Sequence, residues 1–547
     1  MHKCLMAIAV VYICLWAEGV IDTLSIVQET RSTFVPDPGK IAQDRINMIK
    51  SIAEPDIPEQ VEKAALPLSL DDAVKKLLVN NREIKKAKLE YLIGESRFHA
   101  AFGVFEPYLT GSYEYSESER PDALLTELRE SQKGGIEGVL PTGTRYGFSL
   151  AQKDILFAQS SLEWPTLSSN VAVTQPLLKD FVGNGPLSEI KIARAERQVA
   201  YHRYRSTLMS QCYNLENTYW KVVYLQEKRR NAVKSLAVAN QIVNESRTLV
   251  ASGIISKLDA VEVSSQHAQR QINLSDVKME HAGAANELMQ LIGCTPDSVN
   301  AVLTAVTPIQ VSPENQLPDS LPISKADSVM SINQPELLIA QFNRIRSKGA
   351  VSQMRGKVLP ELNVSGIIGV SGFSKNPESS AGEKFLDPEQ NKQNWTCAIE
   401  LKIPLGTGIR ERNLLKAEKL NQKIAEDEEQ SIRNELTAQF LLISDRIRDL
   451  AHNLKNAAVV VEYRNSLLQS ELVRLRAGLS NVRKIFEMEQ ELANACEREL
   501  EMRVQYCMAL SLYDRVLGLT LSKKGLEKIV NGIPVINKDL TRAEPEK

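Results

Sequence analysis

Closely spaced cysteines are the first feature that this 547-residue chain lacks. It contains seven cysteines, and no two of them have the C-x-x-C spacing. The sequence therefore argues against a zinc ribbon and against a disulfide scaffold. Five cysteines lie beyond the N-terminal segment, an odd and widely scattered set that we expect to be small buried hydrophobic side chains. These are Cys212, Cys294, Cys397, Cys496 and Cys507.

Aromatic residues and helix breakers are also scarce. Aromatic residues make up 5% of the chain, which is thin for several packed cores, and there are only 27 Gly and 23 Pro. A prior of about 150 residues per domain would give three or four globular domains. The composition argues against that division and indicates long segments that contain neither Gly nor Pro.

Signals for nucleic acid, nucleotides and catalysis are absent as well. The 66 Lys and Arg nearly balance the 68 Asp and Glu, which removes the electrostatic reason to propose a nucleic-acid partner. The Gly-x-Gly steps at 183–185 and 406–408 have no third Gly and no following Gly-Lys-Ser/Thr. No His pair has metalloprotease spacing, and no Gly-x-Ser-x-Gly elbow occurs. We predict a non-enzyme with no catalytic residue, no cofactor and no metal site.

The N-terminus has the pattern of an export signal. Residues 1–19 combine Lys3, an apolar run from Cys4 to Ala17 and small residues at Ala17 and Gly19, which is typical of a secretory signal peptide. A buried N-terminal helix is the alternative. Residues 20–66 read as an irregular extension, broken by several prolines. No later run of about 18 apolar residues suggests a transmembrane helix.

Two very long segments lack both Gly and Pro. One lies between Pro186 and Gly253, and the other lies between Gly408 and Gly478. Globular helices rarely exceed about 25 residues, so segments of this length indicate coiled-coil-like packing or a helical array. A further helical run follows each glycine, so we expect two long helical hairpins that turn at Gly253 and Gly478.

The order of elements occurs twice. Shifting the sequence to align Asn80 with Asn333 also aligns Pro107 with Pro360 without a gap, and later landmarks align at smaller shifts. Among the later pairs, Gly253 matches Gly478 and Glu262 matches Glu487. We expect a tandem structural repeat. Its predicted divisions are a first repeat at 67–295, a linker at 296–322, a second repeat at 323–520 and a C-terminal tail at 521–547.

Segments with strand-like alternation precede each long helix. In the second half, one face would carry Trp395, Cys397, Ile399, Leu401 and Ile403, and the other face would carry polar side chains. Similar alternation occurs around 109–116, 145–150 and 362–371, and weaker signals lie at 133–139 and 168–177. This pattern fits an outer-membrane barrel, although a soluble half-buried sheet has the same period. The signal peptide and the strand length favour the barrel, and Trp395, Ile399, Leu401 and Ile403 would then face lipid.

About four strands are too few for one chain to close a water-filled barrel. Eight strands are roughly the practical minimum, and a membrane does not tolerate open strand edges. We therefore expect several copies of the chain to share one barrel.

The combined pattern resembles the TolC family of outer-membrane efflux proteins over residues 67–520. The resemblance is carried by the segments 80–84 and 333–337 before the helices, 105–109 and 358–362 before the strands, 174–178 and 402–406 after them, and the turns at 251–254 and 476–479. It implies an α+β homotrimer in the outer membrane of a Gram-negative bacterium. A 12-stranded barrel, about four strands per chain, would continue into a barrel of long helical hairpins that crosses the periplasm.

The resemblance also implies partners and sites. A periplasmic adaptor, joined to an inner-membrane pump or an ABC transporter, would dock at the hairpin tips Gly253, Ile254, Gly478 and Leu479. Asp259, Lys484 and Glu487 would lie at the periplasmic entrance. The family often has two acidic residues three apart in the second half, whereas this chain has Lys484 and Glu487, which could instead be a simple surface pair.

Two function classes follow from the sequence. The first is the channel of a tripartite efflux or type I secretion system, and the second is a periplasmic coiled-coil adaptor or structural protein with a soluble β-domain. A secreted enzyme is a remote third. A polar tunnel is compatible with drugs, metals or polypeptides, so the sequence does not name the cargo.

Overall fold

The computed structural model describes residues 65–526 except for short gaps. The gaps are 121–124, 158–161, 164–165, 180, 182–184, 252–255, 294–301, 306–320, 374–391, 404–407, 477–478 and 480–481. The predicted signal peptide therefore lies outside the described residues, as do nearly all of the extension and the tail beyond 526. Within the described part, no helix is both long and apolar enough to cross a bilayer.

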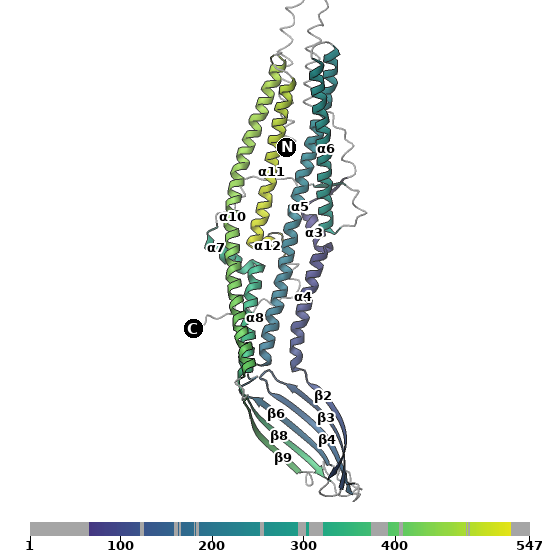
Figure 1. The fold of residues 1–547 in the computed structure, drawn as a ribbon, viewed down its shortest axis with the longest axis vertical. Coiled ribbons are helices and arrows are strands. Elements are labelled where there is room, and N and C mark those ends of the chain that lie inside the picture. The colour runs from purple at the N-terminus through teal and green to yellow at the C-terminus, as the bar shows by residue number, and fades with distance from the viewer. Residues whose placement is uncertain are drawn as a thin grey trace, which may run out of the picture. The chain divides into compact units, whose positions relative to one another are not determined.

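The described residues form two compact units, each built from several stretches of the chain. Unit 1 takes its residues from 1–84, 209–326 and 439–547, and unit 2 takes its residues from 85–208 and 327–438. Most of unit 1 is helical, and unit 2 contains helices and the large sheet (Figure 1). The two units are described separately below.

Helices account for most of the chain, and two of them are very long. α5 (Pro186–Ala251) and α10 (Ile409–Arg476) fill the segments without Gly or Pro. α6 (Lys257–Ile292) and α11 (Val482–Val516) follow them, so the predicted pairs of long helices are present. The remaining helices are α3 (Leu70–Asn80), α4 (Arg82–Ala100), η2 (Ala101–Phe105), α7 (Ile323–Asn333), α8 (Pro335–Val358) and α12 (Thr520–Lys523).

Element boundaries follow the shifts seen in the sequence. The shift that aligns Asn80 with Asn333 also aligns the first residues of α3 and α7, and both helices have 11 residues. The same shift aligns the starts of α4 and α8 and the starts of the strands β2 and β8 that come after them. The starts of α6 and α11 align instead with the smaller shift that matches Gly253 with Gly478. The first half therefore contains additional residues between these landmarks.

A buried asparagine marks the junction between α3 and α4 in unit 1. Asn81 Oδ1 accepts a hydrogen bond from the Ile84 N–H at 3.1 Å, which caps the start of α4. Asn81 Nδ2 donates to the Leu291 carbonyl at 3.0 Å, near the end of α6. Gly293 has φ +77° there, and a Cβ at this position would lie 2.9 Å from the Asn80 Cβ. Only glycine fits this turn without strain.

Unit 1 is held together by apolar contacts across its long helices. Val238, Ala239 and Ile242 of α5 pack with Phe486 of α11, and Val263 of α6 lies against this cluster. Burial of each larger side chain of this kind contributes about 1.5–3 kcal/mol. Elsewhere on α5, the Tyr219 hydroxyl donates to the Leu68 carbonyl at 2.9 Å.

Two short strands lie where the sequence indicated irregular chain. β1 (Ala65–Leu68) pairs in parallel with β7 (Val302–Ala305), so the end of the N-terminal extension is joined to the linker in unit 1. Neither segment alternates in polarity, which is why the sequence did not predict these strands.

Small residues allow the helices of unit 2 to approach closely. A Cβ on Gly94 of α4 would lie 2.8 Å from the Ala200 Cβ of α5, and one on Gly349 of α8 would lie 3.0 Å from Ile192. Tyr91 lies against two aromatic rings of α5, with centroids 5.8 Å from Tyr201 and 6.4 Å from Tyr204. Close backbone approach and aromatic stacking thus stabilise this part of the unit.

The large sheet of unit 2 is an antiparallel meander of six long strands. Their order is β2-β3-β4-β6-β8-β9, and the two-residue β5 (Leu162–Glu163) pairs with β4. The strands lie side by side in one curved sheet (Figure 1). They are β2 (Tyr108–Arg120), β3 (Leu125–Val139), β4 (Arg145–Phe157), β6 (Thr166–Pro176), β8 (Glu361–Phe373) and β9 (Lys392–Lys402).

The expected count of about four strands per chain is wrong. The four clear alternating segments are β2, β4, β8 and β9, and the two weak signals at 133–139 and 168–177 are the full-length strands β3 and β6. The count was too low because β3 does not alternate: its row of side chains on one face includes Glu130, Gln132 and Gly134.

Not all cysteines are buried as expected. Cys212 is fully buried and Cys496 and Cys507 are half-buried, but Cys397 is exposed on β9. Within the described residues, none of these four cysteines forms a disulfide bond. Cys294 lies outside the described residues.

Candidate functional site: an apolar sheet face and the helix ends

One face of the six-stranded sheet carries an uninterrupted apolar row. Paired residues in neighbouring antiparallel strands point to the same face, so the ladder can be followed across the sheet. Leu109 pairs with Ile136, Ile136 with Phe148, and Phe148 with Val171. Val171 then pairs with Ile368, and Ile368 pairs with Trp395. These six residues, one per strand, are called the apolar row below.

The apolar row is exposed along its whole length. The exposed fractions of its side chains run from 46% for Ile136 to 84% for Leu109 at one end, and Trp395 at the other end is 77% exposed. Ile399 and Leu401 on β9 are also exposed on this face, and Ile403 is exposed just beyond the strand. Within the described residues, no helix or loop covers either side of β9.

The opposite face of the sheet is polar and crowded. One row there contains Thr110, Gly135, Ser149, Asn170, Gly369 and Asn394. A Cβ on Gly135 would lie 2.6 Å from the Phe148 carbonyl oxygen, and one on Gly369 would collide with the Asn170 and Asn394 side chains. Glycine at these two positions avoids these clashes on the polar face.

Strand length also matches a membrane crossing. The six strands have 11 to 15 residues each. At about 3.3 Å per residue and a tilt of about 40°, even the shortest spans roughly 28 Å, close to an apolar band of about 25 Å.

The C-terminal ends of α5 and α10, with the starts of α6 and α11 that follow them, form the second candidate site. Of the four predicted tip residues, Gly253, Ile254 and Gly478 lie outside the described residues, and Leu479 has an exposed fraction of 71%. The Leu479 N–H donates to the Arg474 carbonyl at 2.9 Å, five residues back. This spacing is that of the long hydrogen bond in a Schellman turn, which favours glycine directly before the donating residue.

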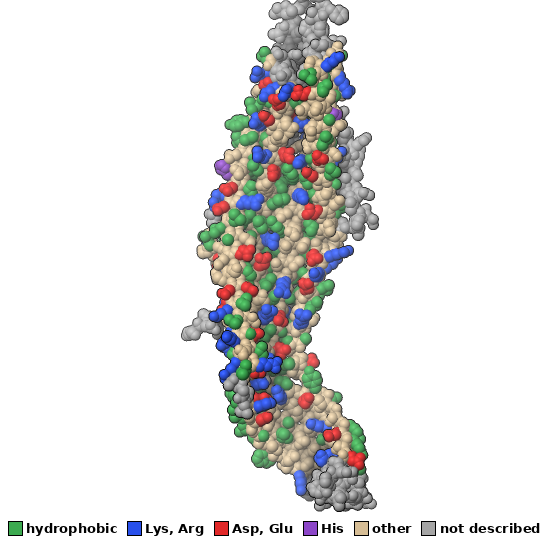
Figure 2. Space-filling view, viewed as in Figure 1, with side chains coloured by type: hydrophobic (Ala, Val, Ile, Leu, Met, Phe, Trp, Pro, Cys, Tyr) green, Lys and Arg blue, Asp and Glu red, His purple; other side chains and the backbone are tan. Residues whose placement is uncertain are grey.

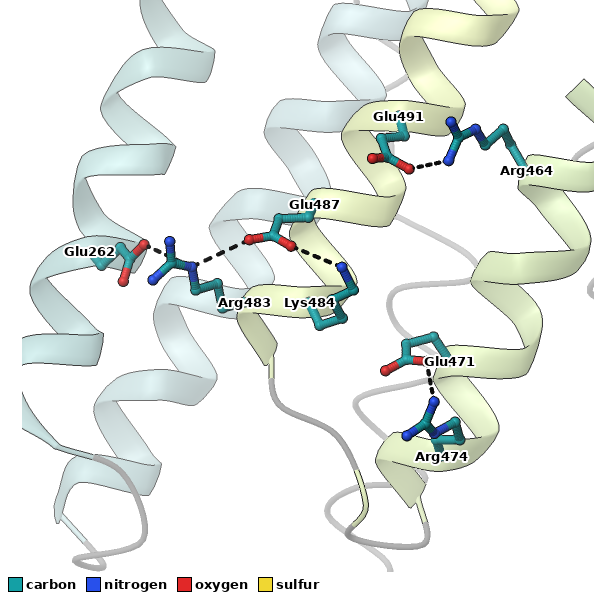
Figure 3. A network of polar contacts seen from close by, with 8 residues as sticks. All are labelled: Glu262, Arg464, Glu471, Arg474, Arg483, Lys484, Glu487 and Glu491. Carbon is teal, nitrogen blue, oxygen red and sulfur yellow. Dashed lines mark hydrogen bonds and ion pairs between the residues drawn. The ribbon is translucent and has the colours of Figure 1, made fainter. Parts of the chain in front are cut away.

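Charged side chains connect α6 and α11 beside this end (Figure 3). Arg483 Nε lies 3.5 Å from Glu262 Oε1 on α6 and 3.4 Å from Glu487 Oε1 on α11. Lys484 Nζ lies 3.2 Å from Glu487 Oε2. Glu262, Arg483, Lys484 and Glu487 are called the tip network below.

The tip network orients side chains more than it stabilises the fold. Its members are exposed to solvent, and exposed ion pairs contribute about 0–1 kcal/mol each. The hydrogen bond from Lys484 and its positive charge hold the pKa of Glu487 below its usual value. Two further pairs lie nearby (Figure 3): Arg464 with Glu491, which joins α10 to α11, and Glu471 with Arg474 at 3.5 Å.

The structure brings together some of the predicted entrance residues and adds one. Lys484 and Glu487 are in direct contact, while the Asp259 side chain lies outside the described residues. Sequence reasoning missed Arg483, which lies between the repeat-equivalent Glu262 and Glu487. Its position four residues before Glu487 on one helix was the available signal.

A titratable group lies two residues after Glu487 on α11. Burial raises the pKa of the Glu489 carboxyl to about 7, and the positive charge of Arg270 only partly opposes this rise. Arg270 itself is buried and donates to the Ser235 hydroxyl at 2.8 Å. Among the residues that the structure describes, no three His, Cys, Asp or Glu side chains come together as a metal site.

Charges of both signs are spread over the surface. Lys, Arg, Asp and Glu are interspersed along the helices on the face that Figure 2 shows. This distribution agrees with the near-zero net charge of −2, and the face shown has no extended surface of one sign for a charged polymer.

Comparison with known proteins agrees with this arrangement. The family model described as "Outer membrane efflux protein" matches residues 145–294, from the start of β4 to just beyond α6. The resemblance to the TolC-like outer membrane efflux family is confirmed. No curated protein matches the sequence.

Solved outer-membrane proteins, two of them described as channels, have the same fold. The CmeC outer membrane channel of Campylobacter jejuni has a TM-score of 0.61 at 12% identity, covering 84% of this chain and 89% of its own. The outer membrane protein VceC of Vibrio cholerae has a TM-score of 0.59 at 14% identity, with 82% and 96% covered. The open state of the MtrE outer membrane channel of Neisseria gonorrhoeae has a TM-score of 0.56 at 13% identity, with 83% and 89% covered.

Proposed function

We propose that this chain is one protomer of a homotrimeric export channel in the outer membrane of a Gram-negative bacterium. The observation that carries the proposal is the apolar row, which crosses all six strands and is uncovered within the described chain. Six exposed large apolar side chains in one row would be unfavourable in water, whereas lipid contact would bury them. The family match and the fold shared with solved outer-membrane proteins support the same assignment.

The same channel needs partners, because a passive conduit does not itself supply energy for export. We assign the hairpin ends, with Gly253, Ile254, Gly478 and Leu479, to docking of a periplasmic adaptor bound to an inner-membrane pump or ABC transporter. Substrates would pass from that pump through the trimer to the exterior, in tripartite efflux or type I secretion.

The tip network would lie at the periplasmic entrance. Lys484 occupies the position equivalent to Asp259 when Gly253 is aligned with Gly478, so each chain would contribute a mixed pair of charges there. We propose an entrance of alternating charge, held by Arg483 and Glu487, in place of a purely acidic ring. Such an entrance would select less strongly for cations than an acidic ring does.

Membrane fractionation tests the proposal. The full-length protein, expressed in a Gram-negative host, should sediment with outer membranes and should require detergent for release. The purified protein should then conduct ions in planar lipid bilayers. Release into the soluble fraction by high salt would contradict the channel and would favour the other class, a periplasmic adaptor or structural protein with a soluble β-domain.

A further inference from the structure

The hairpin made by β3 and β4 belongs to the wall of the sheet. β3 pairs with β2 along its length, from Tyr108 opposite Glu137 to Arg120 opposite Leu125. β4 pairs with β6 from Arg145 opposite Thr174 to Lys153 opposite Thr166. β3 and β4 therefore separate β2 from β6 in the sheet. If the hairpin were only an extended surface loop, β2 and β6 would pair with each other directly, and they do not.

The turn of this hairpin lies at the end of the sheet from which the helices lead. The Leu140 N–H donates to the Thr144 carbonyl at 2.8 Å, and Gly143 turns with φ +84°. The Thr144 hydroxyl also donates to Gln175 Oε1 at 2.5 Å, next to the last residue of β6. Because β2 begins and β6 ends at this level, the hairpin runs through the full depth of the sheet.

The second half of the chain has no counterpart of this hairpin among its described residues. β2 and β8 begin at equivalent positions of the repeat and both have 13 residues, while β6 and β9 both have 11. β8 and β9 are direct neighbours. The first half therefore contributes four strands and the second half two, which accounts for the change of shift noted above.

The two edges of the sheet suit each other in a second copy of the chain. Strand directions alternate through the meander, so β9 runs antiparallel to β2 and could pair with β2 of a neighbouring copy. The apolar row reaches both edges, at Leu109 and Trp395. Tyr113 and Tyr115 of β2 are exposed on the same face, as Ile399 of β9 is, so apolar side chains would meet across the junction.

The register of the strands has the stagger that a closed barrel needs. Cys397 is the middle residue of β9. The residues paired with it across the sheet, one in each of the next four strands, are Gly366, Val173, Tyr146 and Gly138. Continued to β2, the same row arrives opposite residue 107, just before that strand begins. The middle residue of β2 is Glu114, seven positions away. A stagger of about seven residues over six strands corresponds to a tilt of about 40°, within the range of about 35–45° in closed barrels.

We propose that three copies pair β9 to β2 and close an 18-stranded barrel. This rests on the proposed trimeric channel and replaces the 12 strands expected from the family resemblance. At this tilt, 18 strands give a barrel about 36 Å across between Cα positions, compared with about 24 Å for 12 strands. The exit through the outer membrane would then admit larger solutes than a 12-stranded barrel of the same tilt.

Cross-linking between copies tests the pairing directly. Because the apolar face must stay outward, the shift between copies is an even number of residues, which places Cys397 opposite Tyr113 or Tyr115 of the neighbour. A short thiol cross-linker should join Tyr113→Cys or Tyr115→Cys chains into dimers and trimers. Gln152→Cys, on the interior strand β4, is the matched control and should not cross-link, and adding Cys397→Ser should abolish every product.

Deletion of the hairpin tests the strand count. A variant lacking residues 121–157 would join β2 to β6, which keeps both the antiparallel direction and the apolar face. We expect the polyethylene glycol size that enters from the barrel side in planar bilayers to fall, with the limiting diameter reduced by about a third.

The outcomes separate this inference from the proposed function. A full-length trimer that conducts but shows no Cys397 cross-link to β2 would overturn the 18-stranded barrel and leave the channel intact. An unchanged polymer limit in an assembled deletion variant would do the same. A full-length protein that neither inserts nor conducts would overturn the channel itself. If the deletion variant does not assemble, the cross-linking result on the full chain decides.

Discussion

His202 is a buried histidine that the fold keeps uncharged. It lies on α5 in unit 2, stacked on Phe342 with ring centroids 5.4 Å apart, and its exposed fraction is 6%. Burial, helped by the positive charge of Arg205, lowers the pKa of His202 to about 3. Its Nδ1 is buried without a hydrogen-bond partner among the described residues. A neutral aromatic ring is therefore what this position needs.

The His202→Phe variant should resist acid better than the parent. The unfolded chain protonates this histidine near pH 6.5 and the folded chain only near 3, so the parent loses stability as the pH falls from 6.5 toward 3. The variant should be favoured by up to about 3 kcal/mol per chain at pH 4 and should stay within about 1 kcal/mol at pH 7.5. Melting of the detergent-purified protein from pH 4 to 8 measures this. His99→Phe, which removes an exposed histidine, is the control, and an equal acid response of both variants would contradict the account.

The strands of the sheet differ in how well the sequence predicted them. β9 was predicted because Trp395, Ile399 and Leu401 alternate with polar residues, and its neighbour β8 behaves similarly. β3 was only partly indicated, because its side chains on the apolar face include Glu130 and Gln132. A strand whose neighbours supply the apolar surface does not have to alternate itself. A Cβ on Gly138 would lie 2.8 Å from Cζ of the β4 residue Tyr146, so that ring covers this part of β3.

Adjacent isoleucines on β8 allow the two faces of the sheet to be compared. Ile368 belongs to the apolar row and Ile367 faces the polar side, where it is paired with Ala172 and Thr396. Ile368→Lys should cost about 2–4 kcal/mol because a lysine near the middle of the membrane is poorly solvated, whereas Ile367→Lys should be tolerated.

The amount of trimer in outer membranes, read as a heat-sensitive band on gels, compares the two variants. We expect at least a tenfold loss for Ile368→Lys and less than a twofold loss for Ile367→Lys. Equal losses would show that the sheet has no lipid side, and the assignment of the apolar row to lipid contact would then be withdrawn.

At the scale of the whole molecule, the sequence predicted the shared order of elements in the two halves, but it did not predict pairings between distant segments. The shifts that align Asn80 with Asn333 and Gly253 with Gly478 predicted where helices begin, because the same local signals start each element in both halves. The pairing of β1 with β7 was not readable, because it joins segments far apart in the sequence through backbone hydrogen bonds that leave no side-chain pattern. In the proposed trimer, we expect other chains to supply the contacts that a single chain lacks along its strand edges and at its helix ends.

We expect substitutions at the ends of the long helices to abolish adaptor binding without preventing assembly of the trimer. Gly253→Pro or Gly478→Pro should disturb the connection from α5 to α6 or from α10 to α11, since proline fixes φ at about −65° and has no backbone N–H to donate. Each chain should still fold, because the apolar contacts of α5, α6 and α11 around Phe486 are untouched, and we therefore expect the trimer to assemble. We expect a periplasmic adaptor to co-purify with the parent protein and with neither variant. Cells that carry either variant should be as sensitive to toxic compounds as cells from which the gene has been deleted. Gly283→Ala on α6, where an added Cβ meets nothing within 4 Å, is the matched glycine control. Normal resistance in both proline variants would remove these turns from the mechanism, and loss of the trimer would show that they serve folding instead.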